Sequence, residues 1–112
     1  MIYDFASKKC VACEGGVPPI PQNQAEEYVK ETPGWELAED DKKLKRGFKF
    51  KDFKEAMEFV NKVAEVANEE DHHPDIYIFY NEVNLELSTH AIGGLSENDF
   101  IMAAKINEIH EA

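Results

Sequence analysis

The sequence is short of cations and of long apolar runs, and each shortage excludes a class of protein. Twelve lysines and arginines stand against 23 acids, so the formal net charge is −11. A surface for DNA or RNA needs a basic footprint, and we expect no direct nucleic-acid partner. No apolar run approaches the roughly 18 residues of a membrane helix, and residues 1–5 do not begin a signal peptide. We therefore expect a cytoplasmic protein without a membrane partner.

The length and composition indicate one folded domain. The 112 residues are 43% hydrophobic and 31% charged, enough for one core but not for two. We divide the chain into an irregular amino-terminal arm, residues 1–21, and a single domain, residues 22–112. Seven of the twelve cations fall within residues 41–55. This run favours a solvated strand face over an anion-binding patch.

The two cysteines form a Cys10-x-x-Cys13 motif in the arm. Such motifs occur in redox dithiols and in halves of zinc sites. A thioredoxin-like motif opens a helix after a strand, but paired glycines and three prolines follow here and exclude a regular helix. A zinc site would need two more ligands, and the adjacent His72 and His73 are a poor pair for one ion. We favour structural cysteines, with metal and redox roles as alternatives, and expect neither a metal nor a bound cofactor.

Hydrophobic periodicity predicts three helices and four strands. Helices are expected over residues 22–32, from 53 to about 70, and from 97 onward; strands are expected over 35–38, 44–50, 76–80 and 83–87. Asp52 and Ser96 are the predicted N-caps of the second and third helices. The second helix should bury one apolar stripe made of Phe53, Ala56, Met57, Val60, Val63, Ala64 and Ala67.

This order predicts an α+β fold, α-β-β-α-β-β-α, in which a four-stranded antiparallel sheet carries its helices on one face. Such a sheet leaves one bare face and two edge strands. Self-association covers them economically, so we expect a homodimer or homotetramer.

Three of the four histidines lie within nineteen residues of one another and flank the second predicted hairpin. A hairpin brings its outer ends together, so His72 and His73 at its entrance are expected to face His90 at its exit. His90 also ends the polar face of its strand. Histidine donates and accepts protons near neutral pH, and a cluster of three suits acid–base catalysis. Asp99 has two interpretations that can both hold: a capping partner of Ser96, or a carboxylate that orients an imidazole.

The spacing of these residues resembles a known signature. His72-His73-Pro74, five residues, Tyr80, nine residues, His90, eight residues and Asp99 is similar to the pattern of the pterin-4a-carbinolamine dehydratase family. Three further segments look like that family: Pro33-Gly34-Trp35, Phe48-x-Phe50-x-Asp52-Phe53, and Leu87–His90 followed by Gly94-Leu95-Ser96. The resemblance covers about residues 20 to 110.

The resemblance implies a hydro-lyase that dehydrates 4a-hydroxytetrahydropterin, the 4a-carbinolamine, to quinonoid dihydropterin in the recycling of tetrahydrobiopterin-type cofactors. The pterin is then the substrate. By the same resemblance His72 and His90 are the acid/base pair, and His73 contacts and orients the pterin. The implied substrate-binding and supporting residues are Asp71, Ser88, Thr89 and Asp99.

One departure and one alternative accompany the resemblance. Family members often carry an acid four positions before the first histidine, where this chain has Asn68, so a carboxylate that would orient His72 is missing there. Members of the family also act without catalysis, as a dimerisation cofactor of a homeodomain transcription factor or in Rubisco assembly. A protein-binding role is therefore the alternative, while the intact histidine trio favours the enzyme.

Overall fold

The computed structural model describes residues 4–11 and 18–111. In chain order its elements are η1 (Phe5–Ser7), α1 (Gln22–Val29), β1 (Glu36–Ala38), β2 (Lys43–Lys49), α2 (Phe53–Glu70), β3 (Asp75–Phe79), β4 (Glu82–Leu87), η2 (His90–Ile92) and α3 (Glu97–Glu111). The predicted α+β fold is confirmed. No helix in these two described ranges is long and apolar enough to cross a membrane.

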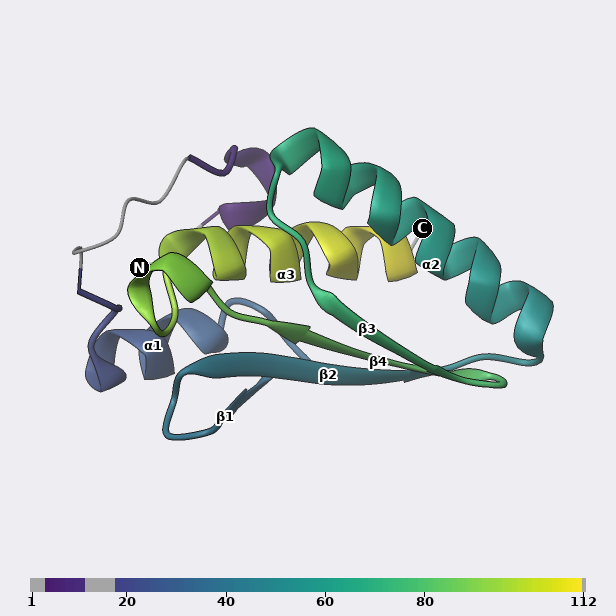
Figure 1. Ribbon diagram of the computed structural model, residues 1–112, viewed down its shortest axis with the longest axis horizontal. Helices are drawn as coiled ribbons and strands as arrows, with labels where there is room; N and C mark the ends of the chain where they lie inside the picture. The colour runs from purple at the N-terminus through teal and green to yellow at the C-terminus, as the bar shows by residue number, and fades with distance from the viewer. Residues whose placement is uncertain (1–3, 12–17, 112) are drawn as a thin grey trace.

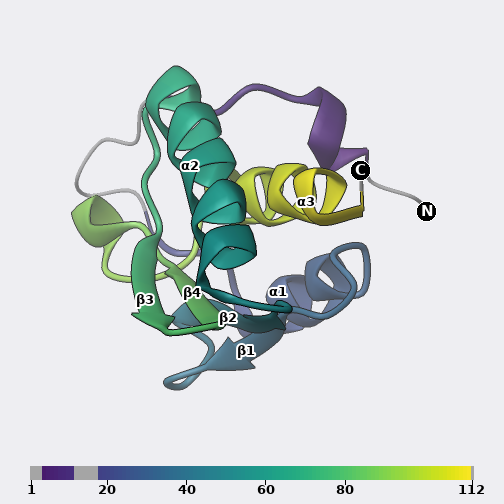
Figure 2. The ribbon, with the colours of Figure 1, turned by 90° about the vertical axis from the view of Figure 1, so that its right-hand side faces the viewer.

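The four strands form one antiparallel sheet in the order β1-β2-β4-β3. The alternation in β4 works as predicted: Val83, Leu85 and Leu87 are fully buried. Because side chains alternate along a strand, the residues between them point to the other face. Figures 1 and 2 show α2 and α3 covering one face of the sheet and leaving the other bare. This layering carries the end of α2 and the start of α3 to the same edge of the molecule.

Helix α2 begins and ends as its sequence predicts, but its buried face differs from the predicted stripe. Met57 and Ala64 are only partly buried, and Phe59, which the stripe omitted, is buried. The Asp52 side chain accepts a hydrogen bond from the backbone N–H of Glu55 at 2.9 Å, the expected N-cap. Phe53, predicted as core, is 49% exposed, whereas Ala56, three residues later, is fully buried. Phe59 takes that place, with its ring centroid 4.7 Å from that of Phe48.

A buried polar network explains the Pro33-Gly34-Trp35 segment. The Trp35 indole Nε1–H and an Arg46 guanidinium N–H both donate to Asn107 Oδ1, and Asn107 Nδ2 donates to the Pro33 carbonyl at 3.0 Å. Gly34 has a φ of +89°, and a Cβ there would lie 2.6 Å from Arg46 Cζ. Glycine is therefore the residue that fits this turn without strain. The network ties the end of α1 to α3.

The described part of the arm differs most from expectation. Residues 5–7 form a short 3₁₀ helix, and Phe5 is buried at 1% exposure. Its ring lies 5.1 Å from that of Tyr28 on α1 and 5.9 Å from that of Phe100 on α3, measured between centroids. The arm therefore contributes an aromatic anchor to the core.

Candidate active site

The turn after α2 sets the position of the first histidine. Asp71 adopts the left-handed conformation (φ 53°, ψ 40°), and the N–H of His72 donates to the carbonyl of Ala67 at 3.2 Å. Aspartate tolerates this conformation better than most residues. The helix thus stops before Pro74, which disfavours a helical residue in front of it. His72 emerges from a defined cap, while the Asp71 side chain is exposed.

The His72 ring meets a buried carboxylate. His72 Nε2 lies 2.6 Å from Asp99 Oδ1, and Asp99 is fully buried. Since a carboxylate accepts hydrogen bonds, His72 donates from Nε2. Within residues 4–11 and 18–111 no hydrogen bond engages the other ring nitrogen, Nδ1. That nitrogen remains available to take up or give a proton.

The second oxygen of the carboxylate is also fully used. Asp99 Oδ2 accepts from the Thr89 hydroxyl at 2.8 Å and from the Ser96 backbone N–H at 3.0 Å. Because the Thr89 hydrogen points to Asp99, the Ser96 hydroxyl donates to Thr89 Oγ1, 2.7 Å away. Asp99 therefore makes both contacts weighed in its sequence: it caps α3 at Ser96 and it holds an imidazole.

His90 lies on the loop that the same network holds. Thr89 and Gly94 form a two-residue bridge, with the Thr89 N–H donating to the Gly94 carbonyl at 2.8 Å, and the left-handed Gly93 closes the turn. The His90 side chain is exposed. It borders a cavity of about 200 Å³ lined by Glu39, Lys42, Lys43, Ser88, Thr89, His90, Gly93 and Gly94. Neither His72 nor His73 lines this cavity.

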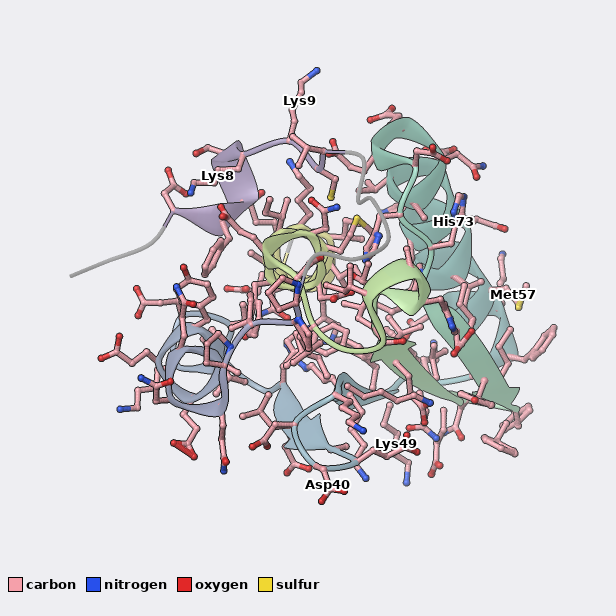
Figure 3. All side chains as sticks on the ribbon, turned by 60° about the vertical axis from the view of Figure 1, so that its left-hand side comes forward. Lys8, Lys9, Asp40, Lys49, Met57 and His73 are labelled. Atoms are coloured by element: carbon pink, nitrogen blue, oxygen red, sulfur yellow. The ribbon has the colours of Figure 1, made fainter. Side chains whose placement is uncertain are left out.

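His73 takes a different partner from the one its neighbour takes. His73 Nε2 lies 3.0 Å from Asn68 Oδ1, so the ring donates to the amide oxygen. Figure 3 shows His73 on the outer side of the end of α2. The expectation from the sequence that position 68 faces His72 is wrong. Asn68 contacts His73 instead. His72 does have a carboxylate partner, which is Asp99.

The predicted residues are thus only partly brought together. One network joins His72, Thr89 and Asp99, and His90 and Ser88 flank Thr89 in sequence. In the described part of the chain no hydrogen bond joins His90 to His72 or His73, and no group of three or more metal-ligating side chains is placed to hold an ion. A larger hollow of about 650 Å³ on the bare face of the sheet contains none of the predicted site residues.

Cys10 lies near this network and is a poor nucleophile. Burial raises the pKa of its thiol to about 12, and the adjacent Glu70 carboxylate adds to the shift. Its Sγ lies 3.7 Å from the Asn98 carbonyl. A thiol that stays protonated at neutral pH is unsuited to redox exchange, which favours the structural interpretation. Cys13, the other half of the motif, lies outside the described residues.

Sequence reasoning missed two residues beside the site. Glu70 and Asn98 neighbour the segments that carry His72 and Asp99, and both bind the backbone of the arm. No local pattern in the sequence marks these contacts, because they join residues 60 and 87 positions apart.

Comparison with known proteins identifies the relatives of this chain. The family model described as "Pterin 4 alpha carbinolamine dehydratase" matches residues 18–109. A protein of Nitrosomonas eutropha is 52% identical over 107 residues, which are 95% of this chain and 93% of that protein. One of Rubrobacter xylanophilus is 43% identical over 95% of this chain and 98% of its own length. Both carry the name "Putative pterin-4-alpha-carbinolamine dehydratase".

A solved structure shares the fold. The protein described as "transcriptional coactivator/pterin dehydratase from Brucella Melitensis" superposes with a TM-score of 0.77 at 35% identity. The match covers 81% of this chain and 97% of that one. Most of that protein therefore has a counterpart here, while part of this chain lies outside the match.

Proposed function

The chain belongs to the pterin 4 alpha carbinolamine dehydratase family, and on that premise we propose that it dehydrates 4a-hydroxytetrahydropterins to quinonoid dihydropterins. This is a hydro-lyase reaction in which the pterin is the substrate. It would serve the recycling of tetrahydrobiopterin-type cofactors. The observation that carries the proposal is the buried Asp99 carboxylate, which joins the His72 ring to Thr89, the neighbour of His90.

The proposed chemistry needs one acid and one base. The C4a–O bond breaks, the leaving hydroxide takes a proton from an imidazolium and departs as water, and a neutral imidazole accepts the N5 proton. We assign these two roles to His72 and His90. With Nε2 held by Asp99, His72 has Nδ1 for proton transfer. No oxidant, reductant or metal enters this balance.

We assign pterin contact to His73, Asp71 and Ser88. The His73 and Asp71 side chains are exposed beside His72, and Ser88 lines the cavity next to His90. Thr89 has a different part, because its hydroxyl hydrogen already binds Asp99. We propose that Thr89 fixes the carboxylate rather than the substrate.

The direct test is the rate at which 4a-hydroxytetrahydropterin disappears, followed by stopped-flow absorbance with purified protein and with buffer alone. We expect turnover well above the spontaneous rate. Loss at the background rate, with circular dichroism showing folded protein, would contradict the proposal. That outcome would favour a non-catalytic role, in keeping with the words "transcriptional coactivator" in the name of the Brucella protein.

We further propose that the protein is a homodimer that pairs through the edge strand β3. Four of the exposed large hydrophobic side chains lie on this strand and its turn: Tyr77, Ile78, Phe79 and Tyr80, at 43%, 37%, 60% and 66% exposure. An edge strand with apolar side chains is a template for pairing with another chain. The opposite edge, β1, has only three residues.

Substituting lysine for Phe79 should therefore weaken self-association at least tenfold, because the new charge would be buried in the dimer interface along β3. Sedimentation velocity across a concentration series would measure this, with twice the chain mass expected for the unsubstituted protein. Lysine at Ala38 on β1 is the matched control and should leave the association unchanged. A monomeric wild-type protein, or equal effects at both edges, would overturn the β3 dimer.

A further inference from the structure

The arm runs alongside the two segments that carry the His72–Asp99 pair. Figure 1 shows it at the end of the molecule where α2 ends and α3 begins. Phe5 anchors it in the core, and Lys105 Nζ on α3 donates to the Ala6 carbonyl at 2.8 Å. The exposed Lys8 forms an ion pair with Glu97, with Nζ 2.7 Å from Oε1. The arm is thus fixed at several points before it reaches the site.

Two side chains then bind the backbone of the arm. The Cys10 N–H donates to Glu70 Oε1 at 2.8 Å. The Val11 N–H donates to Asn98 Oδ1 at 3.0 Å, and Asn98 Nδ2 donates back to the Val11 carbonyl. Asn98 is buried at 4% exposure, and the Glu70 side chain is 11% exposed. Both contacts are partly buried, where a hydrogen bond contributes more than it does in open water.

The two side chains that bind the arm are close in sequence to the His72–Asp99 pair. Glu70 is the last residue of α2, two before His72, and Asn98 immediately precedes Asp99. The backbone from Cys10 to Val11 therefore connects the same two segments that the His72–Asp99 hydrogen bond connects. The family model begins at residue 18, so this connection comes from a part of the chain outside the matched domain.

From this juxtaposition we propose that residues 5–11 form a strap that positions the His72–Asp99 pair, with Glu70 and Asn98 as the positioning residues. The inference rests on the proposed dehydratase function. The strap fixes the separation between the end of α2 and the start of α3. A displacement of about 1 Å would break a 2.6 Å hydrogen bond, and misplacement of this size can cost up to about 10²-fold in rate.

The test compares alanine with glutamine at Glu70. Glu70→Gln keeps an oxygen that accepts from the Cys10 N–H, whereas Glu70→Ala removes it. We expect Glu70→Ala to lower kcat about fivefold to tenfold with little change in KM, and Glu70→Gln to restore most of the rate. Lys9→Ala changes an exposed arm residue for which no side-chain contact occurs within residues 4–11 and 18–111, and it leaves both backbone contacts in place, so it should behave as wild type. Deleting the arm is less informative, because Phe5 belongs to the core.

A second readout does not depend on activity. In protein with ¹⁵N-labelled histidine, the Nε2 resonance of His72 reports its hydrogen bond to Asp99. We expect this signal to shift or broaden in Glu70→Ala and to return in Glu70→Gln. If the wild-type protein has no dehydratase activity while the resonance responds in this way, the proposed function fails and the strap stands. An unchanged resonance and rate in Glu70→Ala, or equal losses in both variants, would overturn the strap.

Discussion

Alanine at His72 or at His90 is expected to lower kcat for pterin dehydration at least tenfold, and by about 10² to 10⁴ if each ring alone carries its proton transfer. Both variants should still fold. His90 is exposed, so its loss should leave stability unchanged. Loss of the His72 ring should lower the free energy of unfolding by about 1 to 3 kcal/mol, because the buried Asp99 Oδ1 then has no partner. Loss of either ring removes the acid or the base. Single-turnover stopped-flow kinetics on each C4a stereoisomer would measure the effect and assign the acid.

Two other histidines serve as internal comparisons. His73→Ala should mainly raise KM, since we assign this ring to substrate contact rather than proton transfer. His110→Ala should leave the rate unchanged, because His110 lies eleven residues beyond Asp99 on α3, about 16 Å along a helix. If His72→Ala and His90→Ala both turned over normally, the proton-transfer assignment would be wrong. An equal loss in His110→Ala would point to a stability effect instead.

The parts of the fold that follow from short-range periodicity could be predicted from the sequence. The strand from Val83 to Leu87 alternates at a period of two, and its apolar members are all fully buried. Asp52 precedes an apolar stripe at helical spacing, and it caps α2. In the strand, the burial pattern repeats every two residues. In the helix, the capping contact joins residues three positions apart. Both features can therefore be read from a short stretch of sequence.

Interactions between distant segments could not be predicted in this way. Phe5 enters the core through Tyr28 and Phe100, and nothing in residues 1–21 distinguishes it from a surface phenylalanine. The choice of Phe59 over Phe53 depends on where α2 lies over the sheet. The periodicity of a helix gives its buried direction, but not the point along its length at which the core begins.

The site shows the same division. The spacing from His72 to Asp99 suggested a shared location, and the hydrogen bond between them is present. The role of Asn68 was misjudged, because residues three to five apart at a helix end have several possible partners, and the left-handed Asp71 decides which ring faces Asn68. Neither the composition nor the hydrophobic periodicity of the sequence predicts the backbone conformation of a single turn residue such as Asp71.

Asp99 is the residue at which fold and proposed chemistry depend on the same atoms. We expect Asp99→Ala to lower the free energy of unfolding by about 3 kcal/mol, because it leaves Thr89, Ser96 and His72 without their buried acceptor. Urea denaturation followed by circular dichroism would measure this loss. The same variant should lose most of its dehydration activity, since His72 is then no longer held.

Asp99→Asn separates the two effects. Its remaining oxygen can still accept from Thr89 and Ser96, so we expect a loss of only about 1 kcal/mol. The new amide N–H₂ would face His72 Nε2, where the wild type has an acceptor, and the ring must change tautomer or turn away. We therefore expect kcat to fall at least tenfold in a protein that remains folded.

Asp52→Asn is the matched control for this exchange of acid for amide. Asparagine caps a helix as well as aspartate does, and Asp52 caps α2 at the end of that helix away from His72. Neither stability nor rate should change appreciably. If Asp99→Asn retained the wild-type rate, Asp99 would act as the cap of α3 alone, because orientation of the imidazole requires an acceptor at that oxygen. If the rate fell while the His72 resonance stayed in place, the carboxylate would act through its charge rather than through orientation.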